Sequence, residues 1–345
     1  MTTVDNHRPG PDGPPGSDPE AVSPARILEL VSGFRAAKFL MAASDLGVFE
    51  ALADAPAPIE VLAARTDLTR RAARIVADAM VALGLLDRTG DTYRNSAAAA
   101  AYLTGTGSSD LRPFLRFSDR MSYPAWTDLA HALRHGPTTQ ITDLDPTLQK
   151  VFSEGVEALN AGPAEALAAS VDLAGRHRLL DVGGGTGSWS IRVARAHPEV
   201  TATVVELPQV VDLARRRIAE HGLAGRIGVV AGDIRTADLP TGHDCALLAN
   251  VVHCFSPADN QLLLGNVRRA VGRGALLLLA DIWTDPTHTE PVVAALMAGE
   301  YAVNIADGDV YSVVEARAWL AGTGWRFVGH RDLTGTKSVV VAEAV

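Results

Sequence analysis

The sequence is poor in cysteine and in long apolar runs. It holds two cysteines in 345 residues, Cys245 and Cys254. So few thiols exclude a disulfide framework, and their spacing matches no zinc-binding pattern, so we expect no metal. The longest apolar runs, such as residues 275–280, are far shorter than the ~18 residues of a membrane-spanning helix. The composition therefore excludes disulfide-rich and transmembrane proteins.

An excess of positive charge is also missing. The chain has 31 Lys and Arg residues against 40 Asp and Glu residues, and its formal net charge is -9. This balance disfavours attraction to nucleic acid. The first ten residues lack the basic stretch and apolar run of a secretion signal. We therefore expect a reduced, cytoplasmic protein that binds neither nucleic acid nor membrane.

Four segments differ in their pattern. Residues 1–23 are rich in Pro, Gly, Asp and Ser, which predicts a disordered leader. Residues 24–105 show helical periodicity and then two helices with a short hairpin, a pattern typical of a winged helix. Residues 106–165 are helical and rich in large side chains, which favours either helix packing or the lining of an apolar pocket. Residues 166–345 alternate apolar strands with helices, which predicts a doubly wound, mostly parallel α/β sheet.

A glycine loop follows the first strand of the predicted sheet. This strand ends at Asp181, and Gly183, Gly185 and Gly187 precede a helix. Glycines allow close backbone approach to a ligand, and a helix start offers unpaired amides. The dinucleotide fingerprint needs a sixth-position glycine, where this chain has Ser188, so binding of NAD is disfavoured but stays open. A purely structural tight turn is the other alternative.

Acidic residues end the next two strands. Glu206 ends the second strand, where a carboxylate can accept hydrogen bonds from both hydroxyls of an adenosine ribose or cap the following helix. The third strand ends in Gly232, Asp233 and Ile234, and this second acid could accept from an adenine amino group. Because ligands bind beyond the carboxyl ends of parallel strands, these residues predict an adenosine-binding cleft.

Taken in order, four motifs resemble those of one enzyme family. Residues 179–187, 204–211, 232–234 and 249–253 are similar to the consecutive motifs of S-adenosylmethionine-dependent small-molecule O-methyltransferases. That family includes plant caffeate enzymes and bacterial polyketide and antibiotic tailoring enzymes, and it has an N-terminal dimerisation domain. The resemblance implies a Rossmann-like class I methyltransferase fold, a homodimer, and S-adenosyl-L-methionine as cofactor, with S-adenosyl-L-homocysteine as product. The implied acceptor is a hydroxyl of a small aromatic secondary metabolite.

The resemblance also implies roles for individual residues. His253 takes the position of the general base, a task that suits an imidazole, and Asp281 matches an acid that orients it. The implied cofactor-binding residues are Asp181, Gly183, Gly185, Glu206, Leu207, Gly232, Asp233, Ile234, Asn250 and Phe255. The implied substrate-binding residues are Met121, Trp126, Phe152, Met297 and Asn304.

Two departures from the family pattern keep alternatives open. His253 is followed by Cys254 and Phe255, where members commonly have Asp and Trp, and a second expected acid falls at Val310. Carbon or nitrogen methylation, or a hydroxylation or pericyclic reaction with the same cofactor, therefore remain alternatives. A transcriptional regulator is a further one, because four arginines lie in or between the predicted helices of the winged-helix segment, although DNA contacts usually need many more. These arginines are Arg65, Arg70, Arg71 and Arg74.

Overall fold

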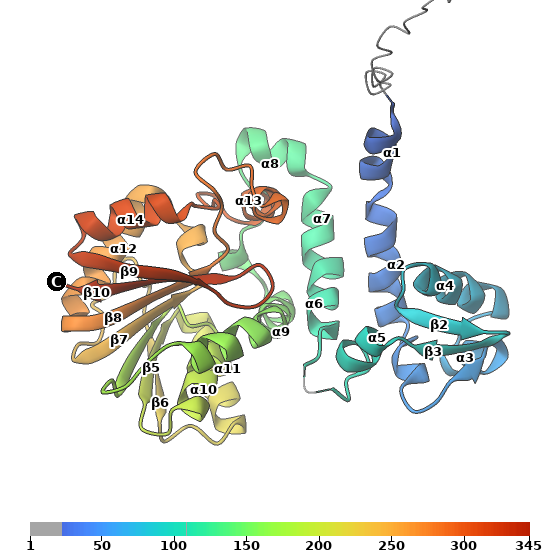
Figure 1. The fold of residues 1–345 in the computed structure, drawn as a ribbon, viewed down its shortest axis with the longest axis horizontal. Helices are drawn as coiled ribbons and strands as arrows, with labels where there is room; N and C mark the ends of the chain where they lie inside the picture. The colour runs from blue at the N-terminus through green and yellow to red at the C-terminus, as the bar shows by residue number, and fades with distance from the viewer. Residues whose placement is uncertain (1–22, 108) are drawn as a thin grey trace, which may run out of the picture.

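The computed structural model describes residues 23–107 and 109–345, which form a smaller N-terminal part, a helical connection and a larger C-terminal part (Figure 1). The predicted leader, residues 1–23, lies outside the described residues except for Ser23.

The N-terminal part combines helices with a small antiparallel sheet. Its helical elements are α1 (Ala25–Ser32), α2 (Phe34–Asp45), η1 (Glu50–Leu52), α3 (Ile59–Arg65), α4 (Arg70–Ala82) and α5 (Ala97–Tyr102). The strands β1 (Ala57–Pro58), β2 (Leu86–Thr89) and β3 (Thr92–Asn95) pair in the order β1-β3-β2. Phe49, Met80 and Tyr93 are fully buried in the shared core. The prediction of two helices followed by a hairpin is confirmed.

A series of helices connects this part to the larger one. It comprises α6 (Arg112–Phe117), the π-helical turn η2 (Ser118–Ser122), α7 (Tyr123–Trp126), α8 (Leu129–His135), η3 (Ile141–Asp143) and α9 (Pro146–Ser170). The Asp145 carboxylate caps α9 by accepting from two backbone amides. Gly155 of α9 allows Phe117 to approach closely, because a Cβ there would lie 2.4 Å from the Phe117 Cβ. The predicted helical character of this segment is confirmed.

A seven-stranded sheet forms the centre of the C-terminal part. Its strands are β4 (Arg178–Val182), β5 (Thr201–Glu206), β6 (Ile227–Ala231), β7 (His243–Ala249), β8 (Val271–Asp281), β9 (Trp325–Asp332) and β10 (Ser338–Ala344). They pair in the order β6-β5-β4-β7-β8-β10-β9, and β10 runs antiparallel to both neighbours. The strand order reverses between β4 and β7, where ligands bind in such sheets. The predicted doubly wound, mostly parallel sheet is confirmed.

Helices cover both faces of this sheet (Figure 1). On one face, α9, α10 (Ser188–Ala196) and α11 (Pro208–Glu220) pack through Leu167, Ile191 and Ile218. On the other face, α12 (Pro257–Ala270) and α14 (Val313–Gly322) pack through residues such as Leu264 and Trp319. Helix α13 (Val292–Asn304) lies near α8. With both faces covered, polar ligands must approach the sheet at its strand ends.

The helices of the described ranges are short or polar. None of them is both long enough and apolar enough to cross a membrane.

Candidate active site

The loop between β4 and α10 depends on glycine. Gly183, Gly185 and Gly187 have φ angles of 71°, 58° and 76°, a region that residues with a Cβ rarely adopt. A Cβ on Gly183 would lie 3.0 Å from the Val251 side chain, whereas one on Gly185 would meet nothing within 4 Å. The backbone at Gly185 is therefore open, and a ligand can approach it closely.

Asp181 lies beneath this loop and is fully buried. Its Oδ2 accepts a hydrogen bond from the Ser190 hydroxyl at 2.6 Å, while Oδ1 has no partner among the described residues. Burial raises the pKa of Asp181 to about 7, although the bond from Ser190 works in the opposite direction. A buried acceptor without a donor is costly, so this oxygen suits a ligand amino group or a water molecule.

Glu206 joins the glycine loop to the end of β5. Its Oε2 accepts from the Gly185 amide at 2.7 Å, and its Oε1 accepts from the Leu207 amide at 2.7 Å. Burial raises the pKa of Glu206 while these two amides lower it, and the net direction is upward. The carboxylate does not cap α11, for which Leu207 is the N-cap residue without a side-chain bond. Each oxygen can accept a further bond, so the pair of oxygens fits two ribose hydroxyls.

The end of β6 lies beside that of β5. The Gly232 amide donates to the Glu206 carbonyl at 2.9 Å. Ile234 is buried in a cluster with Val251, and Phe255 packs against the same cluster. Asp233, in contrast, pairs with Arg235 over 2.7 Å, and these bonds lower the pKa of the Asp233 carboxyl. The carboxylate that was predicted to accept from the adenine amino group thus already accepts from Arg235.

His253 and Asp281 meet at the ends of neighbouring strands. His253 lies in the turn η4 (Val252–Cys254) after β7, and Asp281 is the last residue of β8. The Nδ1 atom lies 2.8 Å and 3.0 Å from the two carboxylate oxygens, and since an ionised carboxylate only accepts, Nδ1 donates. Burial lowers the pKa of His253, but Asp281 and Cys254 together outweigh this effect and raise it. In the neutral imidazole Nε2 is the acceptor nitrogen, and within the described ranges no group hydrogen-bonds to it.

Two further side chains, Tyr301 and Lys337, complete this cluster. The Tyr301 ring on α13 stacks on the His253 ring, with centroids 4.0 Å apart and planes inclined by 3°. Lys337 donates to the Asn250 side-chain oxygen and lies 3.8 Å from Asp281. Lys337 stands just before an apolar strand and looks like an ordinary strand end, so no local signal in the sequence marks it.

Val310 stands where the family pattern has a second acidic residue, and its surroundings are apolar. Its side chain is buried in an apolar cluster with Ile282, Ala294 and Tyr301. The neighbouring Asp309 uses its carboxylate to accept from the Val310 amide at 2.7 Å. Asp281 therefore supplies the carboxylate that contacts His253.

Three of the five predicted substrate residues gather on or against α13. The Trp126 indole donates to a Glu300 carboxylate oxygen, and the Asn304 amide donates to the other at 3.0 Å. The indole also lies on Gly299, where a Cβ would be 2.8 Å from the ring. Met297 packs against the cluster that contains Tyr301.

The other two predicted substrate residues lie on different elements. Phe152 of α9 packs edge-on against Phe117, with ring centroids 5.9 Å apart, and this contact is the helix-packing alternative for that residue. Met121 lies half-buried in η2.

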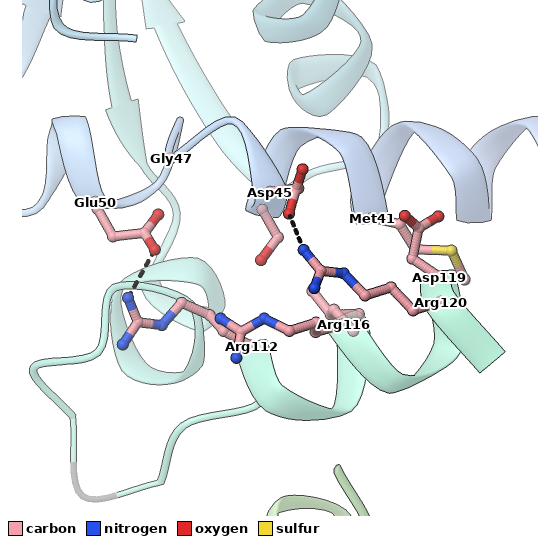
Figure 2. Close-up of a pocket in the computed structure, with 10 residues that line it drawn as sticks. Met41, Asp45, Gly47, Glu50, Arg112, Arg116, Asp119 and Arg120 are labelled. Atoms are coloured by element: carbon pink, nitrogen blue, oxygen red, sulfur yellow. Dashed lines mark hydrogen bonds and ion pairs between the residues drawn. The ribbon is translucent and has the colours of Figure 1, made fainter. Parts of the chain in front are cut away.

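A separate small cavity of about 150 Å³ lies between α2 and the segment formed by α6 and η2 (Figure 2). Ion pairs cross it, with Glu50 and Arg112 2.6 Å apart and Asp45 and Arg120 3.8 Å apart. None of the predicted site residues lines this cavity. These two ion pairs join α2 and the turn after it to α6 and η2, which indicates a contact between helices.

Comparison with known proteins connects this geometry to a family. The O-methyltransferase domain matches residues 127–326, and the O-methyltransferase dimerisation domain matches residues 28–105. The chain is 35% identical to 3-hydroxy-5-methyl-1-naphthoate 3-O-methyltransferase of Streptomyces sahachiroi, over 90% of this chain and 91% of the relative. It is 33% identical to the N,N-dimethyltransferase OxyT of Streptomyces rimosus, over 87% and 90%.

A solved structure agrees with these matches. The crystal structure of the S-adenosylmethionine-dependent methyltransferase SibL is 30% identical and superposes with a TM-score of 0.78, covering 93% of this chain and 99% of that one. The chain therefore belongs to the family of S-adenosylmethionine-dependent O-methyltransferases that carry an N-terminal dimerisation domain.

Proposed function

We propose that this O-methyltransferase methylates a hydroxyl of a small aromatic secondary metabolite and that His253 is its general base. The observation that carries the proposal is the contact between His253 and Asp281, which leaves Nε2 at the ligand-binding edge of the sheet without a hydrogen-bond partner among the described residues. The relative from Streptomyces sahachiroi, which is named for methyl transfer to a naphthoate hydroxyl, supports the acceptor class.

The reaction follows from the roles of these residues. When bound, S-adenosyl-L-methionine supplies a methyl group activated by its sulfonium. His253 Nε2 would take the proton of the acceptor hydroxyl as that oxygen attacks the activated methyl group, so the imidazole would end the step protonated. Asp281 stabilises the imidazolium that forms, because its carboxylate accepts from Nδ1. Because the pKa of His253 is raised, the neutral imidazole is the minor form near neutral pH and becomes more abundant as the pH rises.

Three groups of residues at the strand ends suit the three parts of the cofactor. The unpartnered Asp181 oxygen and the open backbone at Gly185 suit the amino-acid part. The Glu206 carboxylate suits the ribose hydroxyls. The apolar cluster with Ile234 and Phe255 suits the adenine ring.

Calorimetric titration tests the cofactor assignment directly. We expect S-adenosyl-L-homocysteine to bind once per chain, and NAD, which the glycine loop leaves as the competing ligand, not to bind. Binding of NAD without S-adenosyl-L-homocysteine would contradict the proposal.

Nitrogen methylation is the second candidate. The relative OxyT is named an N,N-dimethyltransferase, and an amine acceptor attacks with its own lone pair. Dependence on His253 separates the two reactions, since an unprotonated amine needs no base before attack.

Helix α1 supports a homodimer. No residue of α1 is buried, and Ile27, Leu30 and Val31 are each more than 60% exposed. A helix with this apolar surface needs a partner, and it lies within the segment that matches the dimerisation domain. We expect a dimer in sedimentation velocity at micromolar concentration. The double substitution Ile27→Glu and Val31→Glu should shift it to monomer, and a monomeric unmodified protein would refute the assignment.

A further inference from the structure

We propose that Lys337 is a positioning residue for methyl transfer, which holds the Asp281 carboxylate and the Asn250 amide in their working orientations. The inference rests on the proposed role of His253. Lysine is rare in this chain, which has three: Lys38, Lys150 and Lys337. The side chains of Lys38 and Lys150 are 39% and 69% exposed, whereas that of Lys337 is 7% exposed.

The register of the sheet places this lysine at the site. Ser338, the first residue of β10, pairs with Asp281, the last residue of β8. Lys337 precedes Ser338 at the end of the β9–β10 turn, where its carbonyl accepts from the Leu333 amide at 2.9 Å. The antiparallel insertion of β10 thus brings a residue from the end of the chain to the carboxyl edge of the parallel strands.

Burial of an ammonium group is costly unless the charge is paired. Lys337 donates to the Asn250 side-chain oxygen, and its Nζ lies 3.8 Å from Asp281 Oδ1. Burial lowers the pKa of Lys337, and the Asp281 carboxylate counteracts that effect. Both partners belong to the cluster around His253, so the lysine's position is tied to the site rather than to the general core.

The contact determines how Asn250 points. An ammonium group only donates, so it selects the amide oxygen, and the Asn250 NH2 group, which has no acceptor among the described residues, faces the other way. Asn250 is also fixed through its backbone, since its φ is 58° and its amide donates to the Ala280 carbonyl at 2.9 Å. Without Lys337, the Asn250 side chain would be free to turn over.

The contact with Asp281 acts on His253. Asp281 Oδ1 accepts from His253 Nδ1 at 2.8 Å and from the Ile282 amide at 2.8 Å, and Lys337 approaches the same oxygen. The other titratable groups beside the imidazole are Cys254 and the stacked Tyr301. Lys337 is the one positive charge in this set, so it opposes the imidazolium that Asp281 favours.

The test removes the charge and follows the imidazole directly. We would compare Lys337→Met and Lys337→Gln with Lys337→Arg, which keeps the charge, and with Lys150→Met as a control at an exposed lysine. The first readout is the pH titration of the His253 signal in protein with isotope-labelled histidine, identified by its loss in His253→Gln. The second is the pH profile of kcat at saturating cofactor.

We expect the two uncharged variants to move the titration of His253 to higher pH by about one unit, which lowers kcat near pH 7 about tenfold. Lys337→Arg and Lys150→Met should leave both readouts near those of the unmodified protein. Asp281→Asn should move the titration in the opposite direction, because it removes the negative charge.

An unchanged His253 titration in a folded uncharged variant would overturn the proposal. Failure of both uncharged variants to fold, with Lys337→Arg folded, would assign the lysine a purely structural role and overturn it too. The titration needs no turnover, so its result is independent of the S-adenosyl-L-homocysteine binding that tests the proposed function.

Discussion

Replacing His253 with alanine should lower kcat by about 10²–10⁴-fold, the usual contribution of a positioned general base. The affinity for S-adenosyl-L-homocysteine should stay the same, because the cofactor residues lie on the glycine loop and at the ends of β5 and β6. The measurement is methyl transfer from labelled S-adenosyl-L-methionine to a phenolic acceptor found by screening, with calorimetric titration beside it.

His243 provides a matched control at the opposite end of β7. It is also buried, and its ring nitrogens bond with the Pro240 carbonyl and the Thr203 hydroxyl, both at 3.1 Å. His243→Ala should lower the unfolding temperature and leave kcat nearly unchanged. Equal losses of kcat in both variants would point to general destabilisation. Unchanged turnover in folded His253→Ala would remove the general base and favour an acceptor that attacks with its own lone pair.

The ends of the central strands could be predicted from the sequence because helices bury both faces of the sheet. Strands β4, β5, β7 and β8 are largely buried on both faces and therefore read as apolar runs, so the residue after each run could be assigned to the ligand edge. Strand β9 was not predicted, because five of the eight residues of this edge strand are exposed, among them Arg326, Val328 and His330. Exposure at an edge removes the signal that burial creates.

Sequence patterns predict some of the side chains around His253 and not others. The contact with Asp281 follows from two neighbouring strand ends, and the resemblance implied it. Lys337 reaches the same place through the antiparallel pairing of β10, and Tyr301 reaches it through the packing of α13. Phe152 was assigned to the substrate site but packs between helices. An aromatic residue that lines a pocket and one that packs between two helices look the same in the sequence. Long-range register and packing decide these cases.

Changing Glu206 to glutamine should weaken binding of S-adenosyl-L-homocysteine by about 10²-fold. Hydrogen bonds to a charged group contribute about 1.5–3 kcal/mol each, and a 100-fold change corresponds to about 2.7 kcal/mol. The substitution removes the charge and places an NH2 group against a backbone donor, since the two carboxylate oxygens already face the Gly185 and Leu207 amides. The glycine loop and the ribose acceptor are thus disturbed together.

Glu165→Gln is the control, because Glu165 lies on α9 with a 69% exposed side chain and pairs with Arg192 at the surface. Its affinity for S-adenosyl-L-homocysteine should not change. An analogue without the ribose hydroxyls sharpens the test: it should bind the unmodified protein weakly, and Glu206→Gln should weaken its binding by a smaller factor than that of S-adenosyl-L-homocysteine. If the variant weakens both ligands by the same factor, Glu206 acts on the loop alone and not on the ribose. The ratio of the two losses therefore separates direct recognition of the ribose from support of the glycine loop.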